Sequence, residues 1–577
     1  MLDLLRNQLD ITQVPFSDRG SRLLVFKEQD QDRLYIKLAE RLMGLDSALE
    51  AHVHRPPFIQ NLGLLGPDGQ SLSFSLVTAP DFLVFETEIG TFKLAFQDET
   101  ALAFGLPAGF TCGIMFTVNS EHYQVADSVG KNVPVRTLTW STTGEFVKNE
   151  ITPIAGGETV EVLVRSGEDC SLQIRISDSR SKLDGPVPFS DILVVSRAVW
   201  QEWFEKAPPV AEEYRQTYAY AWWVLANNLV NPRGNVKFEA AMPTKAKYIG
   251  LWLWDSALHA VALRHIDPQL ARDQIRVFLE HQQPDGMLPD VVFDEGVVTE
   301  IGHPIKAKVT KPPILAWAAL KVHETAPDID FLIQIYRPLE RWNAWWFEQS
   351  DEGIDGLAQY NHPYSSGLDD NPLWDEGMPV VSPDLNTYLY HQMQALGRIA
   401  GMLGLEAEAA RWQERSESLV RLMIERLWDE ESGVFRALHR GKPVPVLTPF
   451  NLYPLWTGAL PLGIGKRLLE HLKSPREFWG KRMLPTVARN DPNYSPETMW
   501  RGPVWANINY FFVEALEING LHDDARTLRE ATLDLLRQTN GIYEYYNPET
   551  GEPPVTAAPM FGWSAAVFID LAIRRFF

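Results

Sequence analysis

Cysteine is scarce in this chain, whose 577 residues include only Cys112 and Cys170. Two cysteines allow at most one disulfide, and no cysteine–histidine cluster has the spacing of a zinc site. An Asp-rich calcium loop is missing as well. We therefore expect no metal and no cofactor, and we expect both thiols to be small core residues of the β-rich part rather than reactive groups.

Long apolar runs and an excess of basic residues are also missing. No segment reaches the ~18 apolar residues of a membrane helix, and the start of the chain lacks the basic and apolar regions of a secretory signal. Asp and Glu number 75 against 53 Lys and Arg, which gives a net charge of −22 and disfavours nucleic-acid and anionic-membrane partners. We expect a cytoplasmic protein, and a homo-oligomer stays open.

Up to about residue 200 the apolar residues alternate as in half-buried strands. Phe92, Leu94 and Phe96 show this pattern, and so do Leu172 and Ile174. Turn sequences such as GPDG and STTG separate the predicted strands. The pattern predicts an N-terminal antiparallel β-sandwich-like domain.

After Trp200 the apolar period becomes that of helices, as in Ala271, Ile275 and Phe278. Trp140 is the only tryptophan before residue 200, although the chain has 19. We therefore predict an α+β multidomain protein in which residues 1–204 form the β-rich domain and residues 205–577 a helical catalytic domain. Roughly ten to twelve helices are expected there, and periodicity does not decide between a closed ring and an open solenoid.

Four loops between these helices combine aromatic and polar residues, at 248–260, 362–377, 494–510 and 541–553. Sugars offer apolar faces and hydroxyl edges, so a sugar site needs aromatic platforms beside carboxylates and an arginine. One wall is predicted from Trp252, Trp254 and Asp255, a second from Trp500, Arg501 and Trp505, with Trp374 and Asp375 between them. The alternative is that these tryptophans pack the core between helices.

Hydrolysis of a glycoside needs a protonated carboxyl as acid and an ionised carboxylate as base. Asp369 follows Gly367, which allows a sharp turn, and we predict that Asp369 is the proton donor. Glu544 lies among aromatic residues and is the predicted base. The alternatives are a loop or helix cap for Asp369 and a surface or backbone-bonded carboxylate for Glu544. The other acids in these loops, Asp255, Asp370, Asp375 and Glu497, also compete for these roles.

Six sequence blocks in one order extend this interpretation. WLWDSALHA, HQQPDGMLPD, TKPPILAWA, SGLDDNPLWD, WRGPVWANINY and YEYYNPETGEP together resemble glycoside hydrolase family 63 and related trehalase-like enzymes, including the bacterial mannosylglycerate and glucosylglycerate hydrolase type. The resemblance implies an (α/α)6 toroid, inversion at the anomeric carbon, Asp369 as acid and Glu544 as base. It also implies that the sugar pocket is lined by Tyr248, Trp252, Trp254, Asp255, Gly367, Trp500 and Arg501.

The sequence departs from the family pattern at a few positions. Asp370, Asn371 and Leu373 differ from the common SGxDNSPRWD block, and Lys311 stands where a Gln often precedes the PP pair. A lysine there could meet an acidic group of the substrate, as in glycosides of glycerate. We expect instead that Lys311 is solvated at a loop.

The expected function is therefore an inverting, exo-acting glycoside hydrolase. Its substrate would be an α-glucosidic or α-mannosidic bond in a small saccharide or a sugar-glycerate. Related toroid activities, namely trehalase, α-L-rhamnosidase and glycoside phosphorylase, are the alternatives within the enzyme class. A non-catalytic carbohydrate-binding protein is the alternative outside it.

Overall fold

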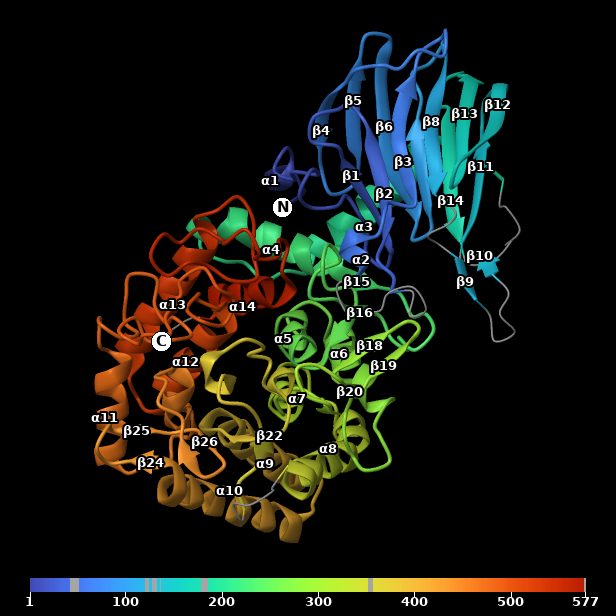
Figure 1. The fold of residues 1–577 in the computed structure, drawn as a ribbon. Helices are drawn as coiled ribbons and strands as arrows, with labels where there is room; N and C mark the ends of the chain where they lie inside the picture. Colours follow the sequence, from blue (N-terminus) through green and yellow to red (C-terminus); the bar gives the residue numbers. More distant parts are fainter. Residues whose placement is uncertain are drawn as a thin grey trace. The chain divides into compact units, whose positions relative to one another are not determined.

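A computed structural model describes residues 1–41, 51–119, 124–126, 132–134, 136–177, 185–350 and 356–574 (Figure 1). The chain divides into two compact units. The first comprises Met1–Ala207, Trp222–Asn231 and Thr244–Gly250, and the second comprises Pro208–Ala221, Pro232–Pro243 and Leu251–Phe577. Helix α4 (Arg215–Asn228) contributes to both units. The sequence predicts one domain boundary, after residue 204, whereas each compact unit consists of several segments. The predicted boundary stays a prediction.

Two six-stranded antiparallel sheets dominate the first unit (Figure 1). The first has the order β1 (Leu23–Lys27), β2 (Leu34–Leu38), β3 (Ile59–Leu65), β8 (Thr111–Asn119), β13 (Gly157–Arg165) and β12 (Glu145–Ile154). The second has the order β11 (Thr137–Thr142), β14 (Ser171–Ser177), β7 (Ala101–Gly105), β6 (Gly90–Asp98), β5 (Leu83–Thr87) and β4 (Ser75–Thr78). Strands β9 (Gln124–Ala126) and β10 (Asn132–Pro134) form a separate pair, and α1 (Leu2–Leu5) and α2 (Ala51–His54) are short helices.

Apolar residues hold this unit together. The rings of Phe116 on β8 and Trp140 on β11 meet edge to face with centroids 6.2 Å apart, so the two sheets are in contact. The strands predicted around Phe92 and Leu172 are β6 and β14. Both cysteines are free and buried, and burial raises the pKa of Cys112 to about 11. The prediction that both cysteines are core residues of the β-rich part is confirmed.

Helix α3 (Phe189–Glu205) packs on the second sheet through Phe189 and Ile192, which contact Ala95 and Ala103. It begins before residue 200, earlier than the sequence pattern predicts. A helical period in the sequence is recognised only when the face toward solvent is polar. In α3 that face carries apolar residues such as Val194, which is 68% exposed, so the apolar spacing of the buried face is obscured.

The helices of the second unit form two sets. The inner set is α5 (Leu253–Leu263), α7 (Leu315–Thr325), α9 (Pro383–Met402), the 3-10 helix η5 (Pro449–Thr457), α12 (Ala506–Ile518) and α14 (Gly562–Ile573). Each contacts the next in this order, and α14 contacts α5, so the contacts close a ring (Figure 1). The outer helices are α6 (Pro268–Leu279), α8 (Ile329–Ser350), α10 (Glu406–Leu427), α11 (Leu462–Leu472) and α13 (His522–Arg537).

Burial explains which helices are inner and which are outer. Every residue of α5 is buried, as expected for a helix that is covered on all sides. Helix α6 buries only one face, and it begins with Asp267, whose side chain accepts a hydrogen bond from the Leu270 amide at 3.0 Å. Pro268 occupies the first position of this helix, where its missing amide hydrogen costs nothing.

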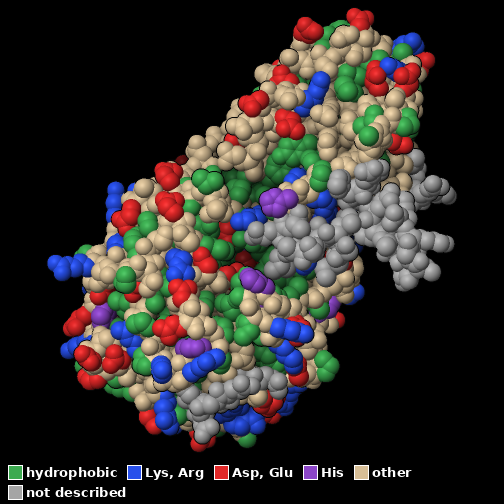
Figure 2. Space-filling view, in the orientation of Figure 1, with side chains coloured by type: hydrophobic (Ala, Val, Ile, Leu, Met, Phe, Trp, Pro, Cys, Tyr) green, Lys and Arg blue, Asp and Glu red, His purple; other side chains and the backbone are tan. Residues whose placement is uncertain are grey.

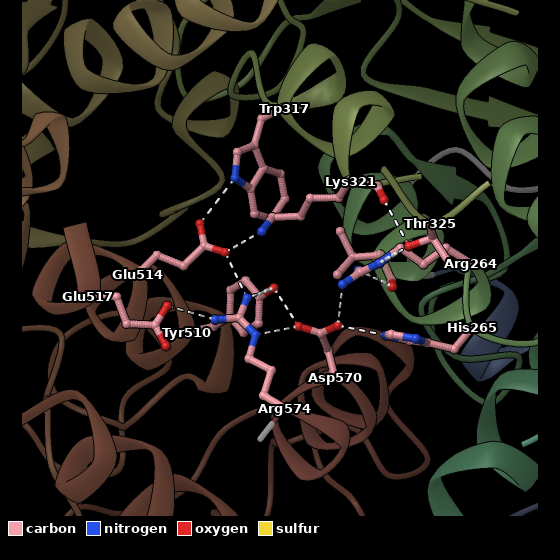
Figure 3. Close-up of polar contacts among 11 residues, drawn as sticks. Arg264, His265, Trp317, Lys321, Thr325, Tyr510, Glu514, Glu517, Asp570 and Arg574 are labelled. Atoms are coloured by element: carbon pink, nitrogen blue, oxygen red, sulfur yellow. Dashed lines mark hydrogen bonds and ion pairs between the residues drawn. The ribbon is translucent and has the colours of Figure 1, made fainter. Parts of the chain in front are cut away.

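A half-buried ionic network joins four inner helices, and its charged groups lie toward their C-terminal ends (Figure 3). Asp570 of α14 accepts a hydrogen bond from the Tyr510 hydroxyl at 2.7 Å, and it lies 2.8 Å from Arg264 and 3.0 Å from Arg574. Nε2 of His265 lies 2.9 Å from the same carboxylate. The network therefore ties α14 to the end of α5.

Glu514 of α12 is the second acid of this network. It lies 2.6 Å from Lys321 of α7 and 2.8 Å from Arg574, and it accepts a hydrogen bond from Trp317 Nε1 at 3.1 Å. Burial alone would raise the pKa of Glu514, but Lys321 and Arg574 outweigh it and lower that pKa to about 2. The pKa of Asp570 is also held well below its usual value, because Arg264 and Arg574 outweigh its burial. We call these residues the ring-end network.

Lys and Arg are interspersed with Asp and Glu over the face drawn in Figure 2. Such mixing leaves no broad basic patch among the described residues of that face, which agrees with the excess of acidic residues. None of the described helices is both long and apolar enough to span a membrane.

Candidate active site

The predicted site loops lie at the N-terminal ends of the inner helices. Trp252 is the N-cap of α5 and Trp505 the N-cap of α12. The loop at 362–377 precedes α9, and the loop at 541–553 precedes α14. The ring therefore collects segments from distant parts of the sequence at one end, opposite to the ring-end network.

The loop that carries Asp369 is held by its own backbone. Gly367 has φ +73°, and a Cβ at this position would lie 2.3 Å from the ring of Trp254, so no other residue fits without a shift. The indole nitrogen of Trp374 donates to the carbonyl oxygen of Leu368 at 2.7 Å. This bond fixes the peptide next to Asp369 and confirms the sharp turn predicted at Gly367.

Hydrogen bonds connect this loop to the loop at 494–510. The backbone amide of Trp500 donates to Asp370 Oδ1 at 2.8 Å, and the Asn371 side-chain amide donates to the carbonyl oxygen of Trp500 at 2.8 Å. Asp370 and Asn371 thus act as links between loops. Burial raises the pKa of Asp370, although the Trp500 amide and Arg501 oppose this, so Asp370 stays a competing acid.

Glu544 lies on a short extended segment that is bonded on both sides. Its backbone amide donates to the carbonyl oxygen of Ala558 at 2.9 Å, and its own Oε2 accepts the Ala558 amide at 3.1 Å. Two residues later, Tyr546 exchanges backbone hydrogen bonds with Val504, at 2.7 and 3.0 Å. Through Val504 the Glu544 segment joins the loop of Trp500, which is bonded to the loop of Asp369.

A buried charge cluster lies where these loops meet. Lys311 Nζ is 3.0 Å from Asp290 Oδ1, and both side chains are at most 4% exposed. Burial alone would lower the pKa of Lys311, but Asp290, Asp369 and Asp255 outweigh it and raise that pKa. The side chain of Lys311 also donates to the carbonyl oxygen of Tyr364. We call Lys311, Asp290, Asp255, Asp369 and Glu544 the acid cluster.

The acid cluster holds more carboxyl groups than cations. Burial raises the pKa of Asp255 well above its usual value, and repulsion from Glu544 adds to this although Lys311 opposes it. Burial also raises the pKa of Asp290, against the effect of Lys311. The raised pKa of Asp255 favours its protonated form, which lessens the negative charge that faces Glu544.

The expectation that Lys311 is solvated is wrong. Its ammonium is buried and paired with Asp290, because one cation is needed among several buried carboxyl groups. Position 311 looked like a loop position in the sequence, and its partner comes from a different loop. Asp290 was not among the predicted site residues, although it ends the block HQQPDGMLPD that carries the family resemblance.

The tryptophans form one packed group. Trp500 and Trp505 stack with centroids 3.6 Å apart, and Trp254 and Trp563 meet edge to face at 4.8 Å. All four side chains are at most 3% exposed, so in this structure these tryptophans pack the core between helices. Trp252 is half-buried, and its ring meets Phe293 at 6.0 Å. Their contact with a sugar stays a prediction.

Trp563 was missed by the sequence analysis. It is the second residue of the apolar helix α14 and has no charged neighbour that would have marked it. Contact with the rings of Trp254, Trp500 and Trp505 makes it the centre of the packed group.

The remaining predicted residues are spread more widely. Arg501 pairs with Asp375 through two hydrogen bonds, one of them 3.0 Å long, so both lie beside the loop link rather than in the acid cluster. Glu497 is exposed and accepts a hydrogen bond from Asn547. Tyr248 belongs to the first compact unit, and its pocket role stays a prediction.

A family model described as the mannosylglycerate hydrolase MGH1-like glycoside hydrolase domain matches residues 248–564. Mannosylglycerate hydrolase of Thermus thermophilus is 26% identical over 411 residues, which cover 58% of this chain and 96% of that protein. Glucosylglycerate hydrolase of Mycolicibacterium hassiacum is 23% identical over 428 residues, with 59% and 95% coverage.

Solved structures give the same picture. The GH63 mannosylglycerate hydrolase from Thermus thermophilus in complex with Tris and D-glycerate aligns with a TM-score of 0.54 and 25% identity, over 61% of this chain and 99% of its own. A bacterial glucoamylase complexed with acarbose aligns over 98% of this chain and 93% of its own, with a TM-score of 0.57. At 11% identity the glucoamylase shows similarity of fold alone.

Proposed function

Because the chain belongs to the mannosylglycerate hydrolase MGH1-like family of glycoside hydrolases, we propose that it is an inverting, exo-acting hydrolase of an α-linked glucoside or mannoside. Within that class we propose a sugar-glycerate as substrate, since similar proteins carry the names mannosylglycerate hydrolase and glucosylglycerate hydrolase. The fold that goes with this function is an N-terminal β-sandwich over residues 1–204 and an (α/α)6 toroid over residues 205–577.

One observation carries the proposal. The loops of Asp369 and Glu544, far apart in sequence, are both bonded to the segment from Trp500 to Val504. These groups also interact electrostatically across the same place, because Asp369 raises the pKa of Lys311 and Glu544 raises the pKa of Asp255. Such an uneven buried charge costs stability, and a binding protein has no chemical use for it.

Each group then has a part in the reaction. Asp369 gives its proton to the oxygen that leaves with the glycerate, and Glu544 takes a proton from water as that water attacks the anomeric carbon from the opposite face. Asp255 forms hydrogen bonds with sugar hydroxyls, and because burial favours its protonated form it leaves the role of base to Glu544. Trp252 and Arg501 lie at the edge of the site and contact the sugar.

The test is an NMR time course with α-glucosylglycerate, α-mannosylglycerate and trehalose. Wild type is expected to release the β-anomer first from a sugar-glycerate. Asp369→Asn and Glu544→Gln are each expected to lower kcat by about 10²–10⁴-fold, the usual contribution of a positioned acid or base. Glu497→Gln removes an exposed acid of a neighbouring loop and is the matched control with unchanged kcat.

Three outcomes would count against the proposal. First release of the α-anomer would replace inversion by retention, and full activity of both variants would remove these two carboxyl groups from the reaction. Binding of the sugars without release of product would favour a carbohydrate-binding protein.

A further inference from the structure

Strand β12 is the edge of the first sheet, and it is unusually exposed. In the part of the chain that the structure describes, it pairs with β13 and with no other strand. Phe146 is 41% exposed, Val147 49%, Ile151 51% and Ile154 45%. A long edge strand with exposed apolar side chains is a template for pairing with another strand.

The sequence of β12 selects one partner, a second copy of itself. When a strand pairs with its own copy about a two-fold axis, some residue lies opposite its counterpart, and the neighbours on either side then face each other. With Asn149 at the centre, Lys148 faces Glu150 of the copy and Val147 faces Ile151. Centring on Lys148 or Glu150 would place like charges opposite each other, and centring on Ile151 would leave Lys148 opposite Ile154.

The two faces of β12 fit this register. Lys148 Nζ lies 3.4 Å from Glu150 Oε2, so these two side chains share one face and would form a four-charge row with those of the copy. Asn149 and Ile151 alternate with them and share the other face, where apolar pairs would form. Opposite charges directly across an antiparallel pair stabilise it, and buried apolar side chains add to the gain.

Three features of β12 would discourage pairing with an unrelated strand. Lys148 places a charge at mid-strand, a bulge lies between Phe146 and Lys148, and Pro153 lacks an amide hydrogen. In the register centred on Asn149, Lys148 gains Glu150 of the copy as an acidic partner besides Glu161 of its own chain, and Pro153 lies near the end of the paired segment. These features therefore select the copy of the same strand over others.

We propose that two copies of this chain associate through antiparallel pairing of their β12 strands about a two-fold axis at Asn149. The sheet of one copy then continues into the sheet of the other. This association is independent of the proposed catalytic function.

The register can be tested with a single disulfide. Asn149→Cys brings two thiols opposite each other at about 4.5–5.5 Å between Cα atoms, within the range that a disulfide bridges. Mild oxidation of the full chain at micromolar concentration is expected to give a covalent dimer on a non-reducing gel. Thr152→Cys is the matched control, because its copies would lie about 20 Å apart in this register. The two native cysteines are buried.

Charge reversal supplies a second measurement. Lys148→Glu places acids opposite each other and is expected to give a monomer by light scattering, whereas the double variant Lys148→Glu, Glu150→Lys restores the dimer of the wild type. A wild type that is monomeric at the same concentration overturns the proposal. So does equal cross-linking of Asn149→Cys and Thr152→Cys, or failure of the double variant to recover.

Discussion

The two ends of the helical ring bury charge in opposite ways. In the acid cluster the pKa values of Asp255 and Asp290 are raised, whereas in the ring-end network those of Glu514 and Asp570 are lowered. Three of these carboxyl groups are buried and the side chain of Glu514 is only 11% exposed, so burial does not make the difference. The difference comes from the number of cations. Lys311 is the one cation named in the acid cluster, whereas the ring-end network contains Arg264, Arg574 and Lys321.

The same helices carry both ends. Asp255 lies in the first turn of α5 and Arg264 directly follows its last residue, about 13 Å away along the helix at 1.5 Å per residue. The positive N-terminal ends of the inner helices face the acid cluster, and the cations Arg264 and Arg574 lie at negative C-terminal ends. A balanced network fits a structural role, whereas uneven charge fits a site of chemistry.

The largest effect is expected from Asp570→Asn. This substitution leaves the half-buried Arg264 without the carboxylate that it pairs with and takes one of three carboxylates from Arg574. Breaking such a network costs about 3–5 kcal/mol. Urea denaturation followed by tryptophan fluorescence measures the loss. Asp523→Asn, at a carboxylate that is 94% exposed, is the matched control and is expected to stay within about 0.5 kcal/mol of wild type. Equal stability of both variants would show that the network does not hold the ring.

The pH dependence of stability should come next in size. Glu514 has its pKa lowered from 4.5 to about 2, so its contribution is fully present above pH 4.5 and is lost as pH falls through 2. Glu514→Gln removes that contribution, which amounts to about 3 kcal/mol above pH 4.5 by this difference in pKa. Its stability should therefore fall less steeply than that of wild type between pH 5 and 2. Parallel pH curves for the two proteins would contradict the lowered pKa.

Lys311→Met removes the only cation named in the acid cluster. We expect a loss of about 2 kcal/mol at pH 8 and a smaller one at pH 5, because Asp255 and Asp290 can take up protons there. The alkaline limb of the kcat profile is expected at higher pH, since Asp369 then keeps its proton without a neighbouring ammonium. The same loss at both pH values would mean that Lys311 stabilises by packing alone.

The smallest effect on stability is expected from Asp255→Asn, the same chemical change as Asp570→Asn at the opposite end. An amide resembles the protonated carboxyl that burial already favours, so stability should change by less than about 1 kcal/mol. The variant is expected to lose about 10–100-fold in kcat/KM with a sugar-glycerate, because the amide does not reproduce the hydrogen bonds of the carboxyl group to the sugar hydroxyls. A loss as large as that of Asp570→Asn would remove the contrast between the two ends.

The elements with regular periods could be predicted from the sequence. Strand β6 and helix α6 have clear alternation or helical spacing, and their side chains meet the expected layers. The loops of Asp369 and Glu544 could be named because aromatic and acidic residues concentrate there. Burial of whole inner helices such as α5 follows from their apolar composition.

The pairings across the ring could not be predicted. Lys311 finds Asp290 in another loop, and Arg574 finds Glu514 on another helix. In the sequence each of these charged residues is indistinguishable from a solvated one, because it meets its partner only when the helical ring closes. Arg264 and His265, two basic residues directly after the mostly apolar segment of α5, were the one local signal for the ring-end network.

Closure of the ring by α5 and α14 also sets an order of events during synthesis. His265 and Asp570 are 305 residues apart, so α5 leaves the ribosome long before its neighbour exists. Until then the apolar flank of α5 that α14 will cover is open to water and to other chains. Contacts at such separation form slowly, and the final turn of α14 is the step that ends this exposure. Crowded nascent chains of this protein therefore need protection from each other until the last helix has been made.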